Sequence, residues 1–308
     1  MPKVHLDTDL GGDIDDLCAL ALLLRWPGVE LTGVTTNCEN EGRRAGYTRY
    51  VLDKEGRESV PVAAGADAAG GYYRVYPGLP EEARYWPQPV APLLSPPGEA
   101  LRLLKHSIDQ GAKIIAIGAF TNLALLEHEH PGILSQADLT LMGGYVHPTR
   151  PGYPQWDNEM DWNVQVDVQS AKTVIEHSSP TLVPLTVTVE TFLRRAYLDA
   201  LRRADWLGRL LARQAEAFAE DEQNEARFGA TCAGLPDDTI NFQHDPLACA
   251  IALGWREGVI SEELLLRLEI QDGWLVERFH PEGKRVRVVT KVDGERFSQF
   301  WLELISAL

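Results

Sequence analysis

Five aspartates lie within ten residues near the start of the chain, in the segment DTDLGGDIDD. They are Asp7, Asp9, Asp13, Asp15 and Asp16. Carboxylates held a few ångströms apart in a partly buried turn repel one another, so either several of them hold protons or a cation lies among them. Ligand sets made only of oxygen favour a hard cation, Ca²⁺ or Mg²⁺. One aspartate would be an ordinary helix cap, but five favour a metal site.

The acidic segment is expected to join a strand to a helix. A short apolar run precedes it, Gly11 and Gly12 fall inside it, and an unbroken apolar run at 17–24 follows it. This pattern predicts a buried strand, a tight turn and a buried helix. The first two aspartates are two residues apart and point to the same side of the strand. The last three fall at the helix start, where free N–H groups and the helix dipole favour anions.

Two known motifs compete for this turn. An EF-hand loop counted from Asp7 needs Asp or Asn at its fifth position and Glu at its twelfth. This chain has Gly11 and Cys18 there, so the EF-hand is excluded. The Asp7-Thr8-Asp9 order also resembles phosphatases of the haloacid dehalogenase type, whose first strand ends in D-x-D. That alternative would also want a downstream Lys together with an acidic G-D-x-x-x-D loop, and no G-D-x-x-x-D segment occurs in the sequence.

Composition is that of an ordinary soluble globule, with 44% apolar and 24% charged residues in 308. The formal net charge of −16 argues against a nucleic-acid backbone or an anionic membrane as the main partner. The four cysteines are scattered without C-x-x-C spacing, which favours reduced thiols. The sequence shows no signal peptide and no apolar run of the ~18 residues that span a bilayer. We therefore expect a cytoplasmic protein.

Alternating strand and helix patterns predict an α/β fold: a single doubly wound, mostly parallel sheet flanked by helices. Further strands are expected at 30–36, 60–64, 113–119, 139–142 and 181–189, and helices at 42–54, 100–110, 121–126, 168–176, 198–220 and 296–308. Residues 264–292 alternate enough for two or three antiparallel strands, a small C-terminal extension. No linker or internal repeat divides the chain, so residues 1–308 are expected to form one domain.

Polar clusters follow several of the expected strands, at 7–16, 36–40, 121–122 and 143–163. Ligands of such sheets bind beyond the carboxyl ends of the strands, so these clusters are expected to share one site. Residues 65–98, rich in Gly, Pro and Tyr, are expected to form either a surface loop or part of a substrate lid. Polar residues at 228–243 predict another loop.

The chain resembles the inosine–uridine-preferring nucleoside hydrolase family. The similar segments are DTDLGGDIDDLCAL (7–20), VTTNCEN (34–40), GAFTNLALL (118–126), LMGGYV (141–146), DWNVQVDVQSAK (161–172) and HDPLACAIAL (244–253). Each segment is short, but they occur in the family's order. The resemblance implies Ca²⁺-dependent hydrolysis of the N-glycosidic bond of a ribonucleoside, giving free base and ribose. A homo-oligomer, either a dimer or a tetramer, is also expected.

The resemblance further implies a Ca²⁺ site made by Asp9, Asp16, Asp245 and the backbone carbonyl of Thr121. The family's general base is an aspartate of the first turn, and this turn has two more residues than the family's commoner D-x-D-P-G-x-D-D. Counting back from the helix selects Asp15, and counting forward from Asp9 selects Asp13. We favour Asp15, because the helix register fixes the direction of a side chain more firmly than a glycine turn does.

Residues implied to contact the substrate come from two loops and from the last motif. They are Asn40, Asn158, Asp161 and Asn163 around the ribose, and His244 near the base. Asp161 stands where the family commonly has Glu, and 65–98 holds no histidine to match the family's histidine in that loop. These departures leave one alternative, a metal-dependent nucleoside- or sugar-binding protein that does not turn its ligand over.

Overall fold

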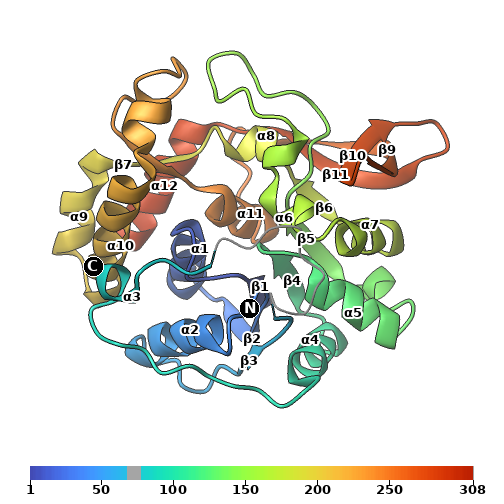
Figure 1. Ribbon diagram of the computed structural model, residues 1–308, viewed down its shortest axis with the longest axis horizontal. Helices are drawn as coiled ribbons and strands as arrows, with labels where there is room; N and C mark the ends of the chain where they lie inside the picture. Colours follow the sequence, from blue (N-terminus) through green and yellow to red (C-terminus); the bar gives the residue numbers. More distant parts are fainter. Residues whose placement is uncertain (68–77, 308) are drawn as a thin grey trace.

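The computed structural model describes residues 1–67 and 78–307. Within them, nine strands form one sheet in the order β10-β9-β11-β6-β5-β4-β1-β2-β3 (Figure 1). The strands are β1 (Lys3–Thr8), β2 (Glu30–Thr36), β3 (Val62–Ala64), β4 (Lys113–Ala116), β5 (Asp138–Met142), β6 (Thr181–Val183), β9 (Ile260–Gln271), β10 (Trp274–Phe279) and β11 (Lys284–Lys291). Part of the expected loop or lid, 68–77, lies outside the described residues.

The sheet is doubly wound, as the sequence predicts. From β1 the chain passes to β2 and β3 on one side and then returns to β4, β5 and β6 on the other, with every neighbouring pair parallel. The winding therefore reverses between β1 and β4, the position at which open α/β sheets bind their ligands. The Asp7-Thr8-Asp9 sequence at the end of β1 lies at this reversal.

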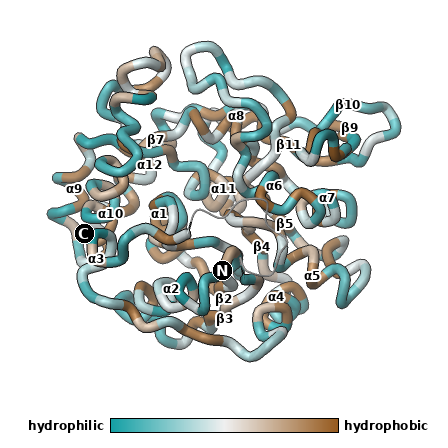
Figure 2. The backbone as a smooth tube through the Cα atoms, in the orientation of Figure 1, coloured by the Kyte–Doolittle hydropathy of each residue, from teal (hydrophilic) through white to brown (hydrophobic). Residues whose placement is uncertain are grey.

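Helices cover both faces of the sheet, and each face has its own apolar core. α1 (Asp15–Arg25), α2 (Arg43–Lys54), α11 (His244–Ala252) and α12 (Gly294–Ser306) contribute to one core. α4 (Glu99–Asp109), α5 (Thr121–Glu129) and α7 (Val168–His177) contribute to the other. β4 serves both, because Ile115 packs on the first side and Ile114 on the second, as the period of a strand requires. Figure 2 shows this hydrophobic interior beneath mostly hydrophilic loops.

Two expected elements are interrupted. The strand predicted at 181–189 ends at Val183, and Leu185–Thr188 form the short helix α8, because Pro184 has no N–H to donate to a sheet. The helix predicted at 198–220 is two helices, α9 (Leu198–Arg203) and α10 (Trp206–Glu222). Between them Asp205 accepts the Gly208 N–H at 3.0 Å and starts α10 as an N-cap.

Two segments join sheets in ways that the sequence pattern did not indicate. Thr239–Phe242, within the loop expected at 228–243, form β8, which pairs antiparallel with β7 (Phe192–Arg194). The C-terminal extension does contain three strands, but it is no separate unit. β11 pairs parallel with β6, so the antiparallel strands continue the main sheet. Long-range pairing decides both features, and local patterns carry little information about it.

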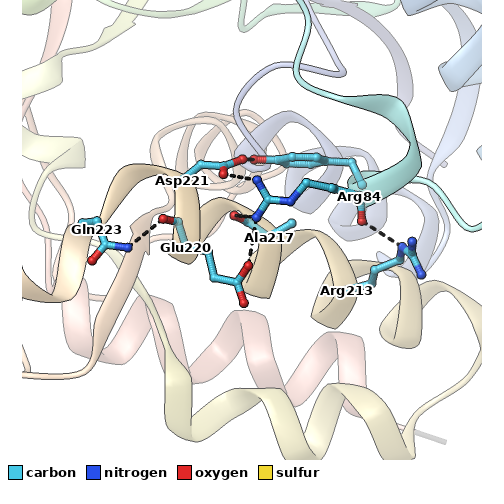
Figure 3. A network of polar contacts seen from close by, with 7 residues as sticks. Arg84, Arg213, Ala217, Glu220, Asp221 and Gln223 are labelled. Carbon is cyan, nitrogen blue, oxygen red and sulfur yellow. Dashed lines mark hydrogen bonds and ion pairs between the residues drawn. The ribbon is translucent and has the colours of Figure 1, made fainter.

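α3 (Glu82–Tyr85) is fastened to α10 by a polar network (Figure 3). The guanidinium of Arg84 pairs with Glu220 and Asp221, and the Tyr85 hydroxyl donates to Asp221 at 2.8 Å. Arg213 donates in return to the backbone carbonyl of Arg84 at 3.0 Å. Single surface ion pairs contribute about 0–1 kcal/mol, but a network of this kind holds a short helix in place. It anchors a helix that follows Gly78 closely in the sequence, and Gly78 lines the cavity described next.

In the described part of the chain, no helix has the length and apolarity needed to cross a membrane. None of the four cysteines, all of which lie in the described residues, forms a disulfide.

Candidate active site

A cavity of about 300 Å³ lies beyond the carboxyl ends of the central strands. Asp9 follows β1, Ile117 follows β4 and Met142 ends β5, and all three line it. The N-terminal ends of α1 and α11, which pack side by side in Figure 1, bring in further acids. Of the four polar clusters expected to share one site, 7–16 and 143–163 therefore meet in this cavity, whereas no residue of 36–40 or 121–122 lines it.

Three carboxylates form the acidic centre of this cavity. One oxygen each of Asp15, Asp16 and Asp245 lies within 4.8 Å of the others, and all three residues are buried. Burial, followed by repulsion from the neighbouring acids, raises the pKa of each well above its ordinary value. Thr8 donates its hydroxyl to Asp16, and the positive charge of Arg44 acts against the rise in the pKa of Asp16. This oxygen set fits a hard divalent cation.

Asp9 lines the same cavity but is not part of that tight set. Burial raises its pKa, while the positive charge of Arg44 and a hydrogen bond from Trp162 act in the opposite direction. Arg44 is buried and also lines the cavity, and its Nε donates to the carbonyl of Cys38 at 2.9 Å. The charge of Asp9 contributes to the raised pKa of Asp15, Asp16 and Asp245, so Asp9 is close enough to act with these three acids. Arg44 offsets part of their charge.

Asp13 lies at the mouth of the cavity. Its Oδ1 accepts the side-chain amide of Asn241 at 2.7 Å and the backbone N–H of Asp15 at 3.3 Å. The carboxylate of Asp13 thus caps the first turn of α1 and is tied to β8. Asp15, by contrast, lies among the buried acids, where its Oδ2 accepts the backbone N–H of Asp245 at 3.4 Å.

Asp7 does not reach the cavity and instead organises the strand ends behind it. Its fully buried carboxylate accepts three hydrogen bonds: from Thr35 at 2.5 Å, Asn37 at 3.0 Å and Asn122 at 2.8 Å. Burial is the largest effect on the pKa of Asp7 and raises it to about 6. Because these partners come from β2, from the turn after it and from α5, one carboxylate locks three segments of the site together.

His244, the first residue of α11, lines the cavity. Its Nδ1 lies 2.6 Å from the Thr188 hydroxyl, and its ring centroid lies 5.4 Å from that of Phe242 and 6.4 Å from that of Trp156. Burial lowers the pKa of His244 to about 3. The imidazole is therefore neutral near pH 7 and can donate or accept one hydrogen bond, but it does not carry a spare proton.

Asp161 and Asn163 both line the cavity from the segment before and within α6 (Trp162–Gln165). Asp161 accepts the backbone N–H of Gly144 at 2.5 Å, and burial raises its pKa to about 7. Asn163 uses its amide nitrogen for the carbonyls of Ile117 at 3.0 Å and Met142 at 3.2 Å. Its amide is thereby fixed between the ends of β4 and β5.

Three of the residues implied by the family resemblance are not among the described residues that line the cavity. The Thr121 hydroxyl donates to Asp167 at 2.6 Å, and Ile117, rather than Thr121, brings the end of β4 to the cavity. Asn158 turns its amide to the carbonyl of Leu275 at 3.2 Å. Asn40 is only half-buried, in the turn where the Glu39 carboxylate caps the start of α2 through the Ala45 N–H.

Sequence reasoning missed several residues of this region. Asn37, Arg44 and Asn241 are single polar residues in ordinary contexts, and their spacing gives no signal. Asn122 falls at the start of an expected helix, and nothing in its position indicates that its side chain bonds Asp7 and the Ala66 N–H. Only a chemical argument could have singled out Asp7: a carboxylate expected on a buried strand needs hydrogen-bond donors from its neighbours.

Comparison with known proteins shows which family the chain is similar to. The family model of the inosine-uridine preferring nucleoside hydrolases matches residues 4–299. The chain is 27% identical to the pyrimidine-specific ribonucleoside hydrolase RihA of Enterobacter sp. (strain 638), over 94% of this chain and 87% of that protein. It is also 27% identical to the non-specific ribonucleoside hydrolase RihC of Klebsiella pneumoniae (strain 342), over 98% of each.

The fold agrees as well. The structure superposes on the purine-preferring ribonucleoside hydrolase from Gardnerella vaginalis with a TM-score of 0.78 at 19% identity, covering 99% of this chain and 98% of that one. With a family model matched over nearly its whole length, the chain belongs to the inosine-uridine preferring nucleoside hydrolase family.

Proposed function

We propose that this protein is a Ca²⁺-dependent ribonucleoside hydrolase that breaks the N-glycosidic bond and releases free base and ribose. The observation that carries the proposal is the set of three buried carboxylates, Asp15, Asp16 and Asp245, at the base of a cavity of about 300 Å³. Polar and aromatic side chains line the same cavity, as a site for a sugar and a base requires. The family membership favours this activity over that of a haloacid dehalogenase-type phosphatase.

Asp9, Asp16 and Asp245 are the residues proposed to hold the ion. Their donor atoms are all oxygen, which suits Ca²⁺, and their mutual repulsion would be relieved by a divalent cation. The family resemblance implies the Thr121 carbonyl as a further ligand. We propose that the chain at Ile117, directly after β4, takes this place, because Ile117 lines the cavity. When bound, Ca²⁺ would lower the pKa of a water molecule that it coordinates.

Asp15 is the proposed general base. It lies next to Asp16 and Asp245, two of the three proposed ion ligands, and its carboxylate can accept the proton of the attacking water while they are engaged. Asp13 is the weaker candidate, because its Oδ1 already accepts two hydrogen bonds at the cavity mouth. Its proposed part is to fix the first turn of α1.

The sugar is proposed to lie against Asp161 and Asn163, which line the same cavity as the acids. Negative charge on Asp161 would stabilise the positive charge that develops on the ribose ring. The base would lie toward Trp156 and His244. Since His244 is neutral near pH 7, its proposed role is a hydrogen bond to the leaving base rather than the transfer of a stored proton.

The test is direct. The protein is incubated with inosine, uridine, adenosine and cytidine in Ca²⁺, and release of free base is followed by chromatography, with and without a chelator. Release that stops on chelation and returns with added Ca²⁺ supports the proposal. Ribonucleoside binding without any release of base would instead favour the metal-dependent binding protein. Release unaffected by excess chelator would contradict the ion's role.

A further inference from the structure

Glu277 is a buried carboxyl group on the C-terminal hairpin that the proposed reaction does not use. It lies on β10, the outermost strand of the sheet, and is 6% exposed. Its Oε2 has no hydrogen-bond partner among the residues that the structure describes. Burial first, and then the charge of Asp161, raises the pKa of Glu277 to about 8. A buried carboxyl group with one oxygen unpaired lowers the stability of the fold. Its presence here therefore calls for another role in the protein.

Glu277 and Asp161 hold two consecutive backbone amides. Asp161 accepts the N–H of Gly144 at 2.5 Å, and Glu277 Oε1 accepts the N–H of Tyr145 at 3.4 Å. Gly143 and Gly144 have φ values of 145° and 106°, so this turn adopts a backbone that only glycine enters readily. A Cβ on Gly144 would lie 3.7 Å from Glu277 Oε1, and one on Gly143 would lie 3.4 Å from Asp161 Oδ1. The two carboxyl groups therefore brace one glycine turn.

The strand that carries Glu277 is also bound to the segment that carries Asp161. The side chain of Gln165 accepts the Leu275 N–H at 2.9 Å and donates to the Leu275 carbonyl at 2.8 Å, in the manner of a neighbouring strand. Asn158 donates to the same carbonyl at 3.2 Å. In Figure 1, β10 accordingly lies next to α6 and α7. Residues 158–165, which bring Asp161 and Asn163 to the cavity, are thus fixed to the hairpin at both ends.

We propose that β10 is part of the substrate site and that Glu277 is a positioning residue, which acts through Asp161 and the Gly143–Gly144 turn to hold the carboxylate that faces the sugar. This inference rests on the proposed function for the identity of the ligand. In its protonated form Glu277 fills its place without adding a second negative charge beside Asp161. Its size and its acceptor atom for Tyr145, rather than its charge, do the positioning.

The test compares Glu277→Gln with Glu277→Leu. The amide of Gln keeps the size and the acceptor for the Tyr145 N–H, whereas Leu removes the acceptor. Glu277→Leu is expected to lower kcat for ribonucleosides about tenfold with KM within about twofold, since the carboxylate that stabilises the charge developing on the ribose is displaced. Glu277→Gln is expected to keep both constants within about twofold. Glu282→Gln, the same change at an exposed position in the turn before β11, serves as the matched control.

A second measurement does not depend on turnover. Hydrogen exchange at the Gly144 and Tyr145 amides and across 158–165 should be about tenfold faster in Glu277→Leu and unchanged in Glu277→Gln. Should the Leu variant fail to fold, Glu277→Asp replaces it, because the shorter side chain draws its acceptor away from Tyr145. Parental kcat and parental exchange in the Leu or Asp variant would overturn the proposal, as would a Gln variant as impaired as the Leu variant. If the parent protein hydrolyses no ribonucleoside, the proposed function fails, but the exchange experiment still decides the role of Glu277.

Discussion

The backbone N–H of Asp245 points to Oδ2 of Asp15 at 3.4 Å, although the two residues are 230 positions apart in the chain. Each is at the N-terminal end of a helix, α1 for Asp15 and α11 for Asp245. Helix N-termini favour negative charge, so two of them facing each other can hold acids that would otherwise repel. Because of this contact, the acidic centre is built from two helix N-termini that are far apart in the sequence.

Divalent cation should stabilise the folded protein. Because Asp16 and Asp245 lie in a cluster whose carboxylates repel one another, adding Ca²⁺ is expected to raise the Tm and a chelator to lower it. Asp245→Asn should lose most of this Ca²⁺-dependent rise in differential scanning calorimetry. Asp109→Asn, on the exposed face of α4, is the matched control and should keep it. An equal rise in Asp245→Asn and the parent would show that Asp245 is no ligand.

Removing the proton acceptor at position 15 should abolish most of the activity. General base catalysis contributes roughly 10²–10⁴-fold, so kcat of Asp15→Asn is expected to fall by that order while ribonucleoside binding persists. Asp13→Asn should be milder, since that carboxylate caps α1 and bonds Asn241. Asp16→Asn should fail through lost ion binding. Normal turnover in Asp15→Asn together with an inactive Asp13→Asn would reverse the assignment of the base.

The loss of kcat on removing the His244 side chain should be larger for a poorer leaving group. Its pKa, lowered to about 3 by burial, leaves it neutral, so it can help the departing base only through a hydrogen bond. His244→Ala is expected to lower kcat for inosine about 10–100-fold, far less than Asp245→Ala does. With 4-nitrophenyl riboside, whose leaving group needs no such help, the same variant should keep nearly parental kcat. An equal loss on both substrates would place His244 elsewhere in the mechanism.

Stability should depend on pH through His5. Burial lowers the pKa of this fully buried imidazole to about 3, against about 6.5 in the unfolded chain. Its contribution is therefore complete above pH 6.5 and is lost as the pH falls from 6.5 toward 3, at about 1.4 kcal/mol per unit. Denaturant unfolding of His5→Gln should show a shallower loss over pH 6.5–4.5 than the parent, even though lost bonds to Ser107 and Thr35 lower its stability at pH 8. His106→Gln, at an exposed position, should follow the parental curve.

The sequence by itself determined the local elements and the parallel class of the sheet. The alternation of strand and helix patterns located β2 at Glu30–Thr36 and α2, α4 and α7 to within one or two residues. These elements depend on apolar periodicity, which can be read from residues that are close together in the sequence. The acids of 7–16 and Asp245 could likewise be chosen from residue type and family resemblance, because parallel strands place all their carboxyl ends on one edge.

Tertiary structure alone decided which polar side chain faces the cavity. Asp7 and Asp9 were expected on one side of a strand, but β1 ends at Thr8, and Asp7 turns to Thr35, Asn37 and Asn122 while Asp9 lines the cavity. Asn158 bonds Leu275 and Asn163 lines the cavity, although only five residues separate them in the sequence. Glu277 comes from a hairpin whose pairing with β6 through β11 is a contact between distant segments. A buried polar group turns toward whichever partner satisfies it, and that partner is known only once distant segments have packed together.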